Sequence, residues 1–250
     1  MKNIIICGCC GKMGKVIASV CDSNDKLNVI AGVDGYDSKD RSFPVYPSFS
    51  EIGEKADVII DFSNPSVLDE MLDYAIKSKT PIVIATTGYN GKDLEKINNA
   101  AKEIPILFSY NMSIGINLLT ELAKTAAKLL GNDFDIEFIE KHHNQKIDAP
   151  SGTALMLANA MSETLKEKPI YEYDRHSKRA RRQKNEIGIH SIRGGTIVGE
   201  HEIIFAGHDE VISLKHQANS KEIFAHGAVN AALFIANKPA GLYSMHDMID

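Results

Sequence analysis

KNIIICGCCGKMG, residues 2–14, combines an apolar strand pattern, a glycine-rich turn and the start of a helix. A strand followed by glycines and then by a helix is the context that a dinucleotide-binding fingerprint requires. Glycines at 8, 11 and 14 let the backbone turn tightly and approach a pyrophosphate at the helix N-terminus. The spacing is G-x-x-G-x-x-G, one residue longer in its first gap than the common form. We therefore predict an NAD(P) site here; a structural glycine turn of another α/β fold is the alternative.

Polar residues follow three later strands of the same pattern. Asp34 ends the second predicted strand, 20 residues after Gly14, where a carboxylate can bind an adenosine ribose diol and disfavour a 2′-phosphate. The segments ATTG at 85–88 and SYNM at 109–112 follow the fourth and fifth strands. Because open α/β sheets bind ligands at the carboxyl ends of their strands, both loops are candidate cofactor contacts. Turn chemistry alone is the other interpretation of each loop.

The first 110 residues alternate apolar strands with helical patterns. The sequence predicts strands at 2–7, 27–33, 57–61, 81–85 and 104–108, and helices at 12–23, 65–78 and 91–102. Alternation of this kind predicts a parallel sheet that helices cover on both faces.

The pattern changes after about residue 113. It predicts a long helix from Ile114 to Leu130, a strand ending near His142, a helix at 151–166, several strands near 187–217 and a final helix at 222–236. Because the later strands come without intervening helices, this part is expected to be α+β. We predict two domains, the first interrupted by the second: residues 1–112 plus 222–250, and residues 113–221.

Composition restricts the class of protein. The 250 residues are 44% hydrophobic and 24% charged, as in an ordinary globular protein. A net charge of −5 argues against general nucleic-acid binding, and neither a signal peptide nor an apolar run of membrane-spanning length is visible. We expect a cytoplasmic protein without nucleic-acid or membrane partners. The basic segment at 175–184, RHSKRARRQK, is interpreted as a solvated loop or as an element that steers an anionic substrate.

All four cysteines lie in the first 21 residues, at positions 7, 9, 10 and 21. The run Cys7-Gly8-Cys9-Cys10 contains a C-x-x-C, which can be redox-active or bind metal. No further Cys or His ligand lies nearby in the sequence, and disulfides are rare inside cells. We interpret these cysteines as small side chains that fill a turn, and we expect no metal.

The segment EKHHNQKIDAPSGT, residues 140–153, brings proton donors and an anion site together. His142 and His143 are adjacent, Lys146 follows, and PSGT at 150–153 opens an apolar-periodic helix. The free N–H groups of a first helical turn bind carboxylate or phosphate, and His and Lys can supply protons near neutral pH. This predicts an enzyme that binds a small anionic substrate and protonates it. Metal ligation by the histidines, a structural His pair and a solvated lysine are the alternatives.

With these motifs, the chain resembles the dihydrodipicolinate reductase family of diaminopimelate and lysine biosynthesis. The matching segments are GCCGKMG (8–14), DFSNP (61–65), ATTG (85–88), YNMSIGIN (110–117), EKHHNQKIDAPSGTA (140–154), IRGGTIVGEHEIIFAGHDE (192–210) and FAHGAVNAALFI (224–235). The resemblance covers nearly the whole chain. It implies a Rossmann-type parallel-sheet domain that binds the dinucleotide, interrupted by an α+β domain that binds the substrate and builds a homotetramer. It also implies hydride transfer from NADH or NADPH.

The resemblance implies roles for individual residues. His142 is similar to the family's proton donor or acceptor and Lys146 to its second proton donor. His143 resembles the substrate-binding histidine, and Gly152 with Thr153 the backbone cradle for a carboxylate of a small dicarboxylate substrate. The cofactor-contacting positions are matched by Gly8, Cys9, Cys10, Gly11, Lys12, Met13, Asp34, Ala85, Thr86, Thr87, Ser109, Tyr110, Asn111 and Met112.

The chain departs from the family pattern beside Asp34. Some members have a basic residue directly after this acid, whereas here it is Gly35, so a strong preference for NADPH is not expected. Lys12, Lys39 or Arg41 can compensate, and we predict that NADH is at least as good a cofactor as NADPH. Cysteine also occupies two loop positions where smaller residues are more usual.

The sequence thus predicts an NAD(P)H-dependent oxidoreductase, by resemblance a 4-hydroxy-tetrahydrodipicolinate reductase. One rival is a reductase of the same fold that acts on another small dicarboxylate or aldehyde. Another is a non-catalytic NAD(P)-sensing module, which would keep the glycine loop but has no need of the HHxxK and PSGT groups.

Overall fold

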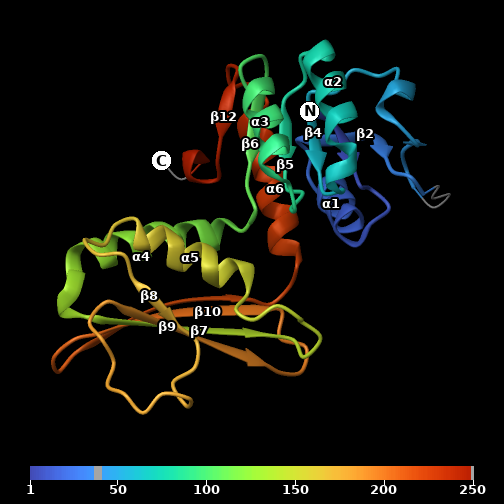
Figure 1. Cartoon of the computed structure of the whole chain (residues 1–250). Helices are drawn as coiled ribbons and strands as arrows, with labels where there is room; N and C mark the ends of the chain where they lie inside the picture. Colours follow the sequence, from blue (N-terminus) through green and yellow to red (C-terminus); the bar gives the residue numbers. More distant parts are fainter. Residues whose placement is uncertain (37–40, 249–250) are drawn as a thin grey trace. The chain divides into compact units, whose positions relative to one another are not determined.

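Figure 1 shows the computed structural model of the chain, which describes residues 1–36 and 41–248. Two compact units are present: residues 1–114 with 221–250, and residues 115–220. Lys39, one of the cations considered for the cofactor, lies outside the described residues.

Within the described residues, the first unit is built on a seven-stranded sheet in the order β12-β6-β5-β4-β1-β2-β3, with every neighbouring pair parallel. The strands are β1 (Lys2–Cys7), β2 (Leu27–Val33), β3 (Val45–Tyr46), β4 (Val58–Asp61), β5 (Ile82–Ile84), β6 (Pro105–Phe108) and β12 (Gly241–Tyr243). The chain runs outward from β1 to β3 and returns to β4 on the other side of β1. Strand order therefore reverses between β1 and β4, where open α/β sheets bind ligands.

Helices cover this sheet on both faces because its strands are apolar on both sides. The helices are α1 (Lys12–Asp22), α2 (Leu68–Ser78), α3 (Gly91–Ala100) and α6 (Glu222–Ile235). Ile4 and Ile6 of β1 join residues of α1 and α6 in one core cluster. Ile5 and Cys7, which point to the opposite face, join residues of α2 and α3 in another.

Some element boundaries differ from the sequence prediction. The helix expected from residue 65 begins as a 3-10 turn, Pro65–Val67, before α2. Asn64 caps that turn through its side chain, which accepts the Ser66 N–H. The helix expected at 151–166 is α5 (Gly152–Ser162), and it stops early where the Thr164 hydroxyl donates to the Met161 carbonyl. The sequence does not predict the short strands β3, β8 (Ile170–Glu172) and β12.

The second unit is a five-stranded sheet in the order β11-β10-β7-β9-β8, with β7 antiparallel to β10 and parallel to β9. Besides β8 and α5, its elements are α4 (Ile114–Leu130), β7 (Asp135–His142), β9 (Glu186–Arg193), β10 (Gly199–Ala206) and β11 (Val211–Ala218). Helices α4 and α5 lie over one face of the sheet (Figure 1), where Phe138, Leu157 and Phe205 are fully buried. The predicted fold class, a parallel α/β domain interrupted by an α+β domain, is confirmed.

Among the described residues, no helix has both the length and the apolar character that crossing a bilayer requires.

Candidate active site

The loop between β1 and α1 requires glycine at two of its positions. Gly8 has φ of +78°, and a Cβ there would lie 2.5 Å from the carbonyl oxygen of Phe62. A Cβ on Gly14 would lie 2.2 Å from the carbonyl oxygen of Gly8. Glycine therefore allows the loop to fold tightly against both β4 and the first turn of α1. The N-cap, Gly11, offers no side chain to the first N–H groups of α1, and the first turn holds no acidic residue. This helix start is a site for an anion.

Asp34 lies beside that loop, at the end of β2. One carboxylate oxygen accepts the Cys10 N–H at 2.8 Å, and the other accepts the Tyr36 N–H at 3.1 Å. Each oxygen keeps a further lone pair. The carboxylate is thus fixed in orientation by the backbone and retains acceptor capacity for a pair of vicinal hydroxyls, as in a ribose.

A cavity of about 410 Å³ adjoins these groups. Four residues predicted to contact the cofactor line it: Gly8, Cys10, Gly11 and Asp34. Its other lining residues, which the sequence prediction did not include, are Cys7, Val33, Gly35, Tyr36, Pro47, Phe62, Ser63, Asn64, Val67 and Glu70. Three of them, Phe62, Ser63 and Asn64, belong to the DFSNP motif at 61–65, which is among the segments that match the family. A second hollow, of about 530 Å³ between the 3-10 turn at Phe49–Glu51 and α2, contains none of the predicted residues.

Two further predicted loops follow β5 and β6. The loop after β5 meets the loop after β4 near Asp61, a fully buried carboxylate. Asp61 accepts hydrogen bonds from Ser63 and from the Tyr89 hydroxyl, and Thr86 accepts the Ser63 N–H at 2.9 Å. Burial raises the pKa of Asp61, while hydrogen bonds from Ser63 and Thr86 act in the opposite direction. The structure thus joins Thr86 to the loop after β4.

The remaining predicted cofactor residues occupy varied positions. Ala85 and Met112 are buried. The backbone of Met112 packs closely against Gly227, because a Cβ on this glycine would lie 1.7 Å from the Met112 carbonyl oxygen. Asn111 and Ser109 bond to each other at the end of β6, and Tyr110 is 54% exposed beside Phe108. Lys12 and Thr87 are exposed, and Met13 is half-buried. None of these residues lines the 410 Å³ cavity.

The cysteines act mainly as packing groups. Cys9 is fully buried. Its sulfur packs against Gly32, where an added Cβ would lie 2.5 Å from the sulfur. Burial, with the neighbouring Cys10 thiol, raises the pKa of Cys9 to about 12. In the described part of the chain, the metal-type ligands within 4.8 Å of one another are Cys9, Cys10 and Asp34. His142 and His143 are not part of such a group, and all four cysteines are free thiols.

The residues predicted to carry the chemistry lie in the second unit, and His142 lies on the face of its sheet that α4 and α5 cover. Successive strand residues point to opposite faces, so Glu140 and His142 of β7 share the face of buried Phe138. Nδ1 of His142 lies 2.6 Å from Oε2 of Glu140. The side chain of His142 is 11% exposed, whereas that of Glu140 is fully buried.

Arg193, opposite His142 on β9, completes this cluster. Its two terminal nitrogens donate to the two oxygens of Glu140 at 2.9 and 2.7 Å. Burial alone would raise the pKa of Glu140, but hydrogen bonds from His142 and Arg193 hold it well below its usual range. Glu140 is therefore ionised and can only accept, so the shared proton lies on Nδ1 of His142. The sequence prediction did not include Glu140 or Arg193.

His201 of β10 is a further buried group. Its ring lies edge-on to that of His142, with centroids 5.2 Å apart, and its Nε2 is 3.1 Å from the Ser151 hydroxyl oxygen. Burial, assisted by the nearby His142, lowers the pKa of His201 to about 4. His201 is neutral at physiological pH, and its hydrogen bond fixes the residue that caps α5.

The start of α5 is the position predicted for the anion cradle. Ser151 is the N-cap, and its hydroxyl accepts the Ala154 N–H at 3.2 Å. Gly152 is exposed and Thr153 is half-buried in the first turn, which contains no acidic residue. The backbone N–H groups of this turn can bind a carboxylate.

Lys146 lies in the loop between β7 and α5. Its Nζ is 2.8 Å from Asp148, and its side chain is 23% exposed. The hydrogen bond from Lys146 lowers the pKa of Asp148, and the Gly152 N–H adds to this effect. Asp148 thus lies where a substrate carboxylate would interact with the same two groups. His143 follows the strand directly and is half-buried.

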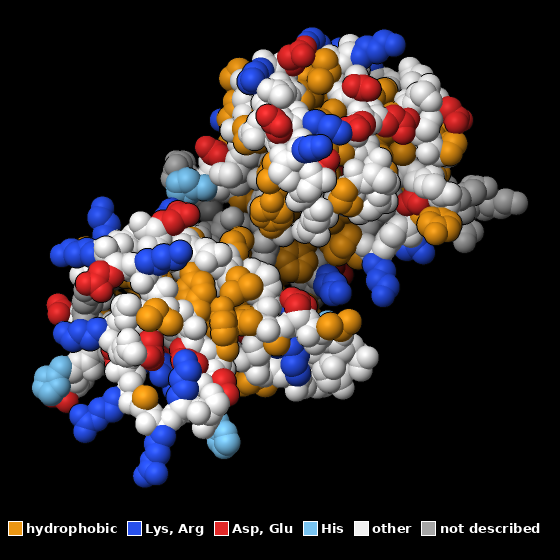
Figure 2. Space-filling view, in the orientation of Figure 1, with side chains coloured by type: hydrophobic (Ala, Val, Ile, Leu, Met, Phe, Trp, Pro, Cys, Tyr) orange, Lys and Arg blue, Asp and Glu red, His pale blue; other side chains and the backbone are white. Residues whose placement is uncertain are grey.

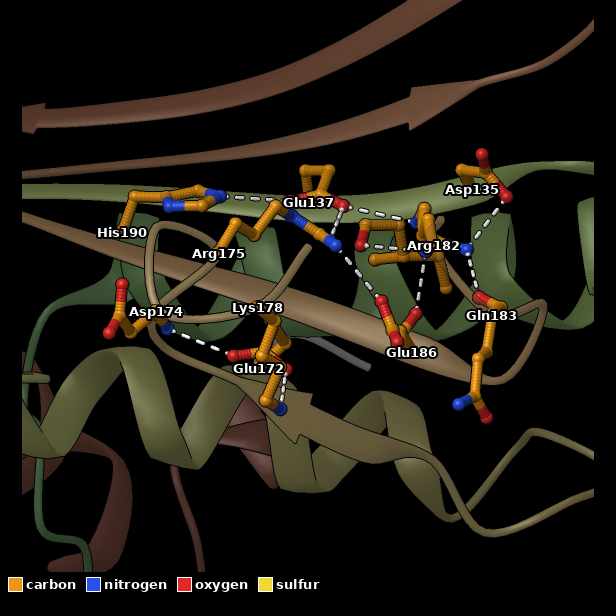
Figure 3. Close-up of polar contacts among 11 residues, drawn as sticks. Asp135, Glu137, Glu172, Asp174, Arg175, Lys178, Arg182, Gln183, Glu186 and His190 are labelled. Atoms are coloured by element: carbon orange, nitrogen blue, oxygen red, sulfur yellow. Dashed lines mark hydrogen bonds and ion pairs between the residues drawn. The ribbon is translucent and has the colours of Figure 1, made fainter. Parts of the chain in front are cut away.

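The basic segment at 175–184 is held mainly by acidic residues of its own unit (Figure 3). Arg175 and Arg182 both bond to Glu137 of β7, at 2.6 and 3.1 Å, on the sheet face opposite Glu140. Lys178 pairs with Glu172. Figure 2 shows acidic and basic side chains interspersed over the visible surface. These ion pairs fix part of the segment to the sheet, which neither interpretation, a solvated loop or a steering element, included.

Comparisons with known proteins give one consistent family. Residues 2–112 match the family model "Dihydrodipicolinate reductase, N-terminus", and residues 115–249 match "Dihydrodipicolinate reductase, C-terminus". A 4-hydroxy-tetrahydrodipicolinate reductase of Caldanaerobacter subterraneus subsp. tengcongensis is 51% identical over 249 residues, covering 100% of this chain and 98% of that protein. One from Clostridium novyi is 47% identical over 249 residues, with the same coverage.

Among solved structures, a dipicolinate-bound dihydrodipicolinate reductase from Paenisporosarcina sp. TG-14 superposes with a TM-score of 0.84. It covers 99% of each chain at 24% sequence identity, and at this identity the match bears on the fold. A diaminopimelate dehydrogenase variant from Clostridium tetani superposes with a TM-score of 0.59 at 15% identity, covering 99% of this chain and 94% of that one.

Proposed function

The chain belongs to the dihydrodipicolinate reductase family, and we propose that it reduces 4-hydroxy-tetrahydrodipicolinate to tetrahydrodipicolinate with NADH or NADPH. This is a step of diaminopimelate and lysine biosynthesis. The observation that carries the proposal is the cluster in the second unit: a proton-bearing histidine, His142, on the same sheet face as an anion-binding helix start, with Lys146 in the loop that joins them.

The residues of the first unit fit a dinucleotide. A side chain at Gly8 or Gly14 would collide with neighbouring backbone atoms, so the loop needs glycine to fold tightly. The backbone N–H groups at the start of α1 can bind the pyrophosphate. Asp34 has acceptors for the ribose diol, and the 410 Å³ cavity adjoins it. The loops at 85–87 and 109–112 lie at the carboxyl ends of β5 and β6, where they can contact the rest of the dinucleotide. When bound, the nicotinamide supplies a hydride.

The residues of the second unit would bind and protonate the substrate. The N–H groups of Gly152 and Thr153 would hold one carboxylate at the start of α5, with His143 as a further polar contact. Lys146 would exchange Asp148 for a carboxylate of the substrate and serve as a second proton donor. His142, with its Nδ1 proton directed at Glu140, keeps Nε2 for the substrate and would deliver the proton that C3 of the product enamine requires.

Cofactor choice follows from the charges near Asp34. Its carboxylate favours a free diol and repels a 2′-phosphate, and the next residue, Gly35, adds no cation. Arg41 lies at the cofactor loop, where its guanidinium donates to the Cys9 carbonyl oxygen at 2.5 Å. We propose NADH as a cofactor at least as good as NADPH, with Arg41 making use of NADPH possible.

We assign dinucleotide binding to the first unit, and substrate binding and homotetramer formation to the second. In support of the last assignment, α4 and α5 cover one face of the second sheet, while Ile139, Ile204 and Val211 on its strands remain partly or largely exposed. The molar mass of the assembly in solution, measured by light scattering, tests whether the chain forms a tetramer. A cytoplasmic location stays a prediction from the sequence.

The test of the activity is loss of NADH absorbance when the purified chain meets freshly prepared 4-hydroxy-tetrahydrodipicolinate. His142→Gln should lower kcat by about 10²–10⁴-fold and leave the Kd for NADH unchanged. Lys146→Ala should lower kcat and also raise the substrate KM, and Thr153→Ala should act mainly through KM. A wild-type chain that binds NADH without oxidising it in this assay would favour the NAD(P)-sensing module. Faster turnover of another small dicarboxylate would favour the same-fold reductase.

A further inference from the structure

We propose that Glu140, held by Arg193, is the positioning residue that fixes the tautomer of His142 and ties it to the start of α5. The inference rests on the proposed function, since it assigns a role within the same site. Neither residue carries a role in the family resemblance or in the sequence prediction.

Hydrogen bonds from His142, Arg193 and the Ser151 N–H reach both oxygens of the Glu140 carboxylate, and the Ser191 side chain adds another. Oε2 accepts from Nδ1 of His142 at 2.6 Å and from Arg193 at 2.9 Å. Oε1 accepts from Arg193 at 2.7 Å and from the Ser151 N–H at 3.1 Å. Glu140 is fully buried. A buried charge is tolerated when it is paired and hydrogen-bonded in this way, so the carboxylate has a single orientation.

This arrangement determines what His142 can offer a ligand. Because the ionised carboxylate holds a proton on Nδ1, Nε2 is the ring nitrogen left to exchange a proton with a substrate. The space beside it is kept by Gly199, where a Cβ would lie 3.2 Å from Nε2.

The same pair links the other parts of the site. Through the Ser151 N–H, Glu140 holds the N-cap of α5 and therefore the carboxylate cradle. Through Arg193, which donates to the Asp148 carbonyl oxygen at 2.6 Å, it holds the loop that carries Lys146. Proton donor, anion cradle and lysine loop are thus fixed to one buried ion pair.

The charged and titratable groups around His142 come from five segments. Glu140 is on the same strand, Arg193 on β9 and His201 on β10, and Lys146 and His216 lie near enough to act on His201. His201 is neutral above about pH 5, since its pKa is about 4. In that range Glu140 is the anion in direct contact with His142, and it holds the proton on Nδ1.

The test is the tautomer of His142 in Glu140→Gln, read from the ¹⁵N shifts of its ring, together with kcat. The variant keeps the shape of the side chain and removes its charge. The Nδ1–H tautomer should be less populated than in the wild type, because a neutral amide can donate to Nδ1 as well as accept from it. We also expect kcat to fall by about 10–1000-fold, part of the 10²–10⁴-fold that proton-transfer groups contribute. The Kd for NADH should not change.

Glu137→Gln is the matched control. Glu137 lies on the same strand and is also paired with arginines, but on the opposite face. This variant loses a structural carboxylate without touching His142, so the tautomer of His142 should not change. A Glu140→Gln enzyme with reduced kcat and the wild-type tautomer of His142 would overturn the proposal, because a purely structural role lowers the amount of active enzyme only.

Two further variants keep the test decisive if Glu140→Gln does not fold. Arg193→Lys keeps a cation but loses the two-pronged contact, and Glu140→Asp keeps the charge but shortens the side chain. Both should lower kcat, and the ¹⁵N shifts of His142 should report less of the Nδ1–H tautomer than in the wild type. Folded variants with unchanged kcat and tautomer would overturn the proposal. A wild-type chain that does not oxidise NADH with the substrate would instead overturn the proposed function.

Discussion

Protonation of His201 is expected to couple the stability of the second unit to pH. The side chain is 4% exposed, and burial lowers its pKa to about 4, with the nearby His142, His216 and Lys146 adding to the effect and Glu140 opposing it. In the unfolded chain the same imidazole has its ordinary value of 6.5. Between these values the unfolded chain binds a proton that the folded chain does not, so stability falls as pH falls from 6.5 towards 4.

The size of this effect follows from the two pKa values. The gap between 6.5 and about 4 corresponds to about 3 kcal/mol of unfolding free energy at about 1.4 kcal/mol per pH unit. By pH 5.0 about 2 kcal/mol of this has been lost, whereas at pH 7.5 both states are neutral and nothing has been lost. The interval from 7.5 to 5.0 is informative because most carboxylates remain ionised across it.

His201→Gln is the perturbation, since glutamine can still bond to the Ser151 hydroxyl but does not titrate. The unfolding free energy is measured from urea denaturation at pH 7.5, 6.0 and 5.0, at one protein concentration. Circular dichroism is the probe because the chain has no tryptophan. We expect the wild type to lose about 2 kcal/mol more than His201→Gln between pH 7.5 and 5.0.

The control is His208→Gln, because the side chain of His208 is 98% exposed and its removal should leave the pH dependence unchanged. Equal pH dependence of wild type and His201→Gln would refute the reasoning. It would mean that the buried imidazole accepts a proton as readily as an exposed one.

Other consequences concern the cofactor loop and the basic segment. The kcat/KM for NADPH should not exceed that for NADH by more than about tenfold, or about 1.4 kcal/mol, because Asp34 has no cation beside it; a larger advantage contradicts that assignment. Alkylation should reach half-buried Cys10 and block NADH binding, and bound NADH should slow it; full modification with an unchanged Kd would be inconsistent with its place at the cavity. Gly14→Ala should lower the free energy of unfolding by about 1–3 kcal/mol or more, because its Cβ would lie 2.2 Å from a backbone oxygen; an unchanged urea midpoint would show that the loop can relax. Arg182→Ala should speed tryptic cleavage within the basic segment, because this side chain joins it to β7; an unchanged cleavage rate would show that the ion pairs do not hold it.

The fold was largely predictable because its signals are local and repeated. Each strand–helix pair of the first unit carries an apolar run and a glycine, proline or cap residue at its boundary, and the alternation itself specifies a parallel sheet. The failures are the edge strands β3, β8 and β12, of two to three residues each. Segments this short have no detectable periodicity, and their pairing depends on neighbours distant in the sequence.

The candidate site was predictable to the extent that its residues are close in sequence. His142, Lys146 and the PSGT segment lie within one stretch, whereas Arg193 comes 53 residues after Glu140 and reaches it through the pairing of β7 with β9. Glu140 itself had a usable signal: two residues before His142 in a strand, it must share the histidine's face. A carboxylate in that position is a candidate partner for the imidazole.

Strand β7 explains how one segment serves both structure and chemistry. Glu137 and Glu140 are an odd number of residues apart, so they lie on opposite faces. Each is held by arginine from a segment later in the chain: Glu137 by Arg175 and Arg182 of the basic segment, Glu140 by Arg193 of β9. A slip of one residue in the pairing would exchange the two faces and direct His142 away from α5. The alternation of apolar Ile136 and Phe138 under the helices opposes such a slip, so the packing of the core also determines which carboxylate reaches the histidine.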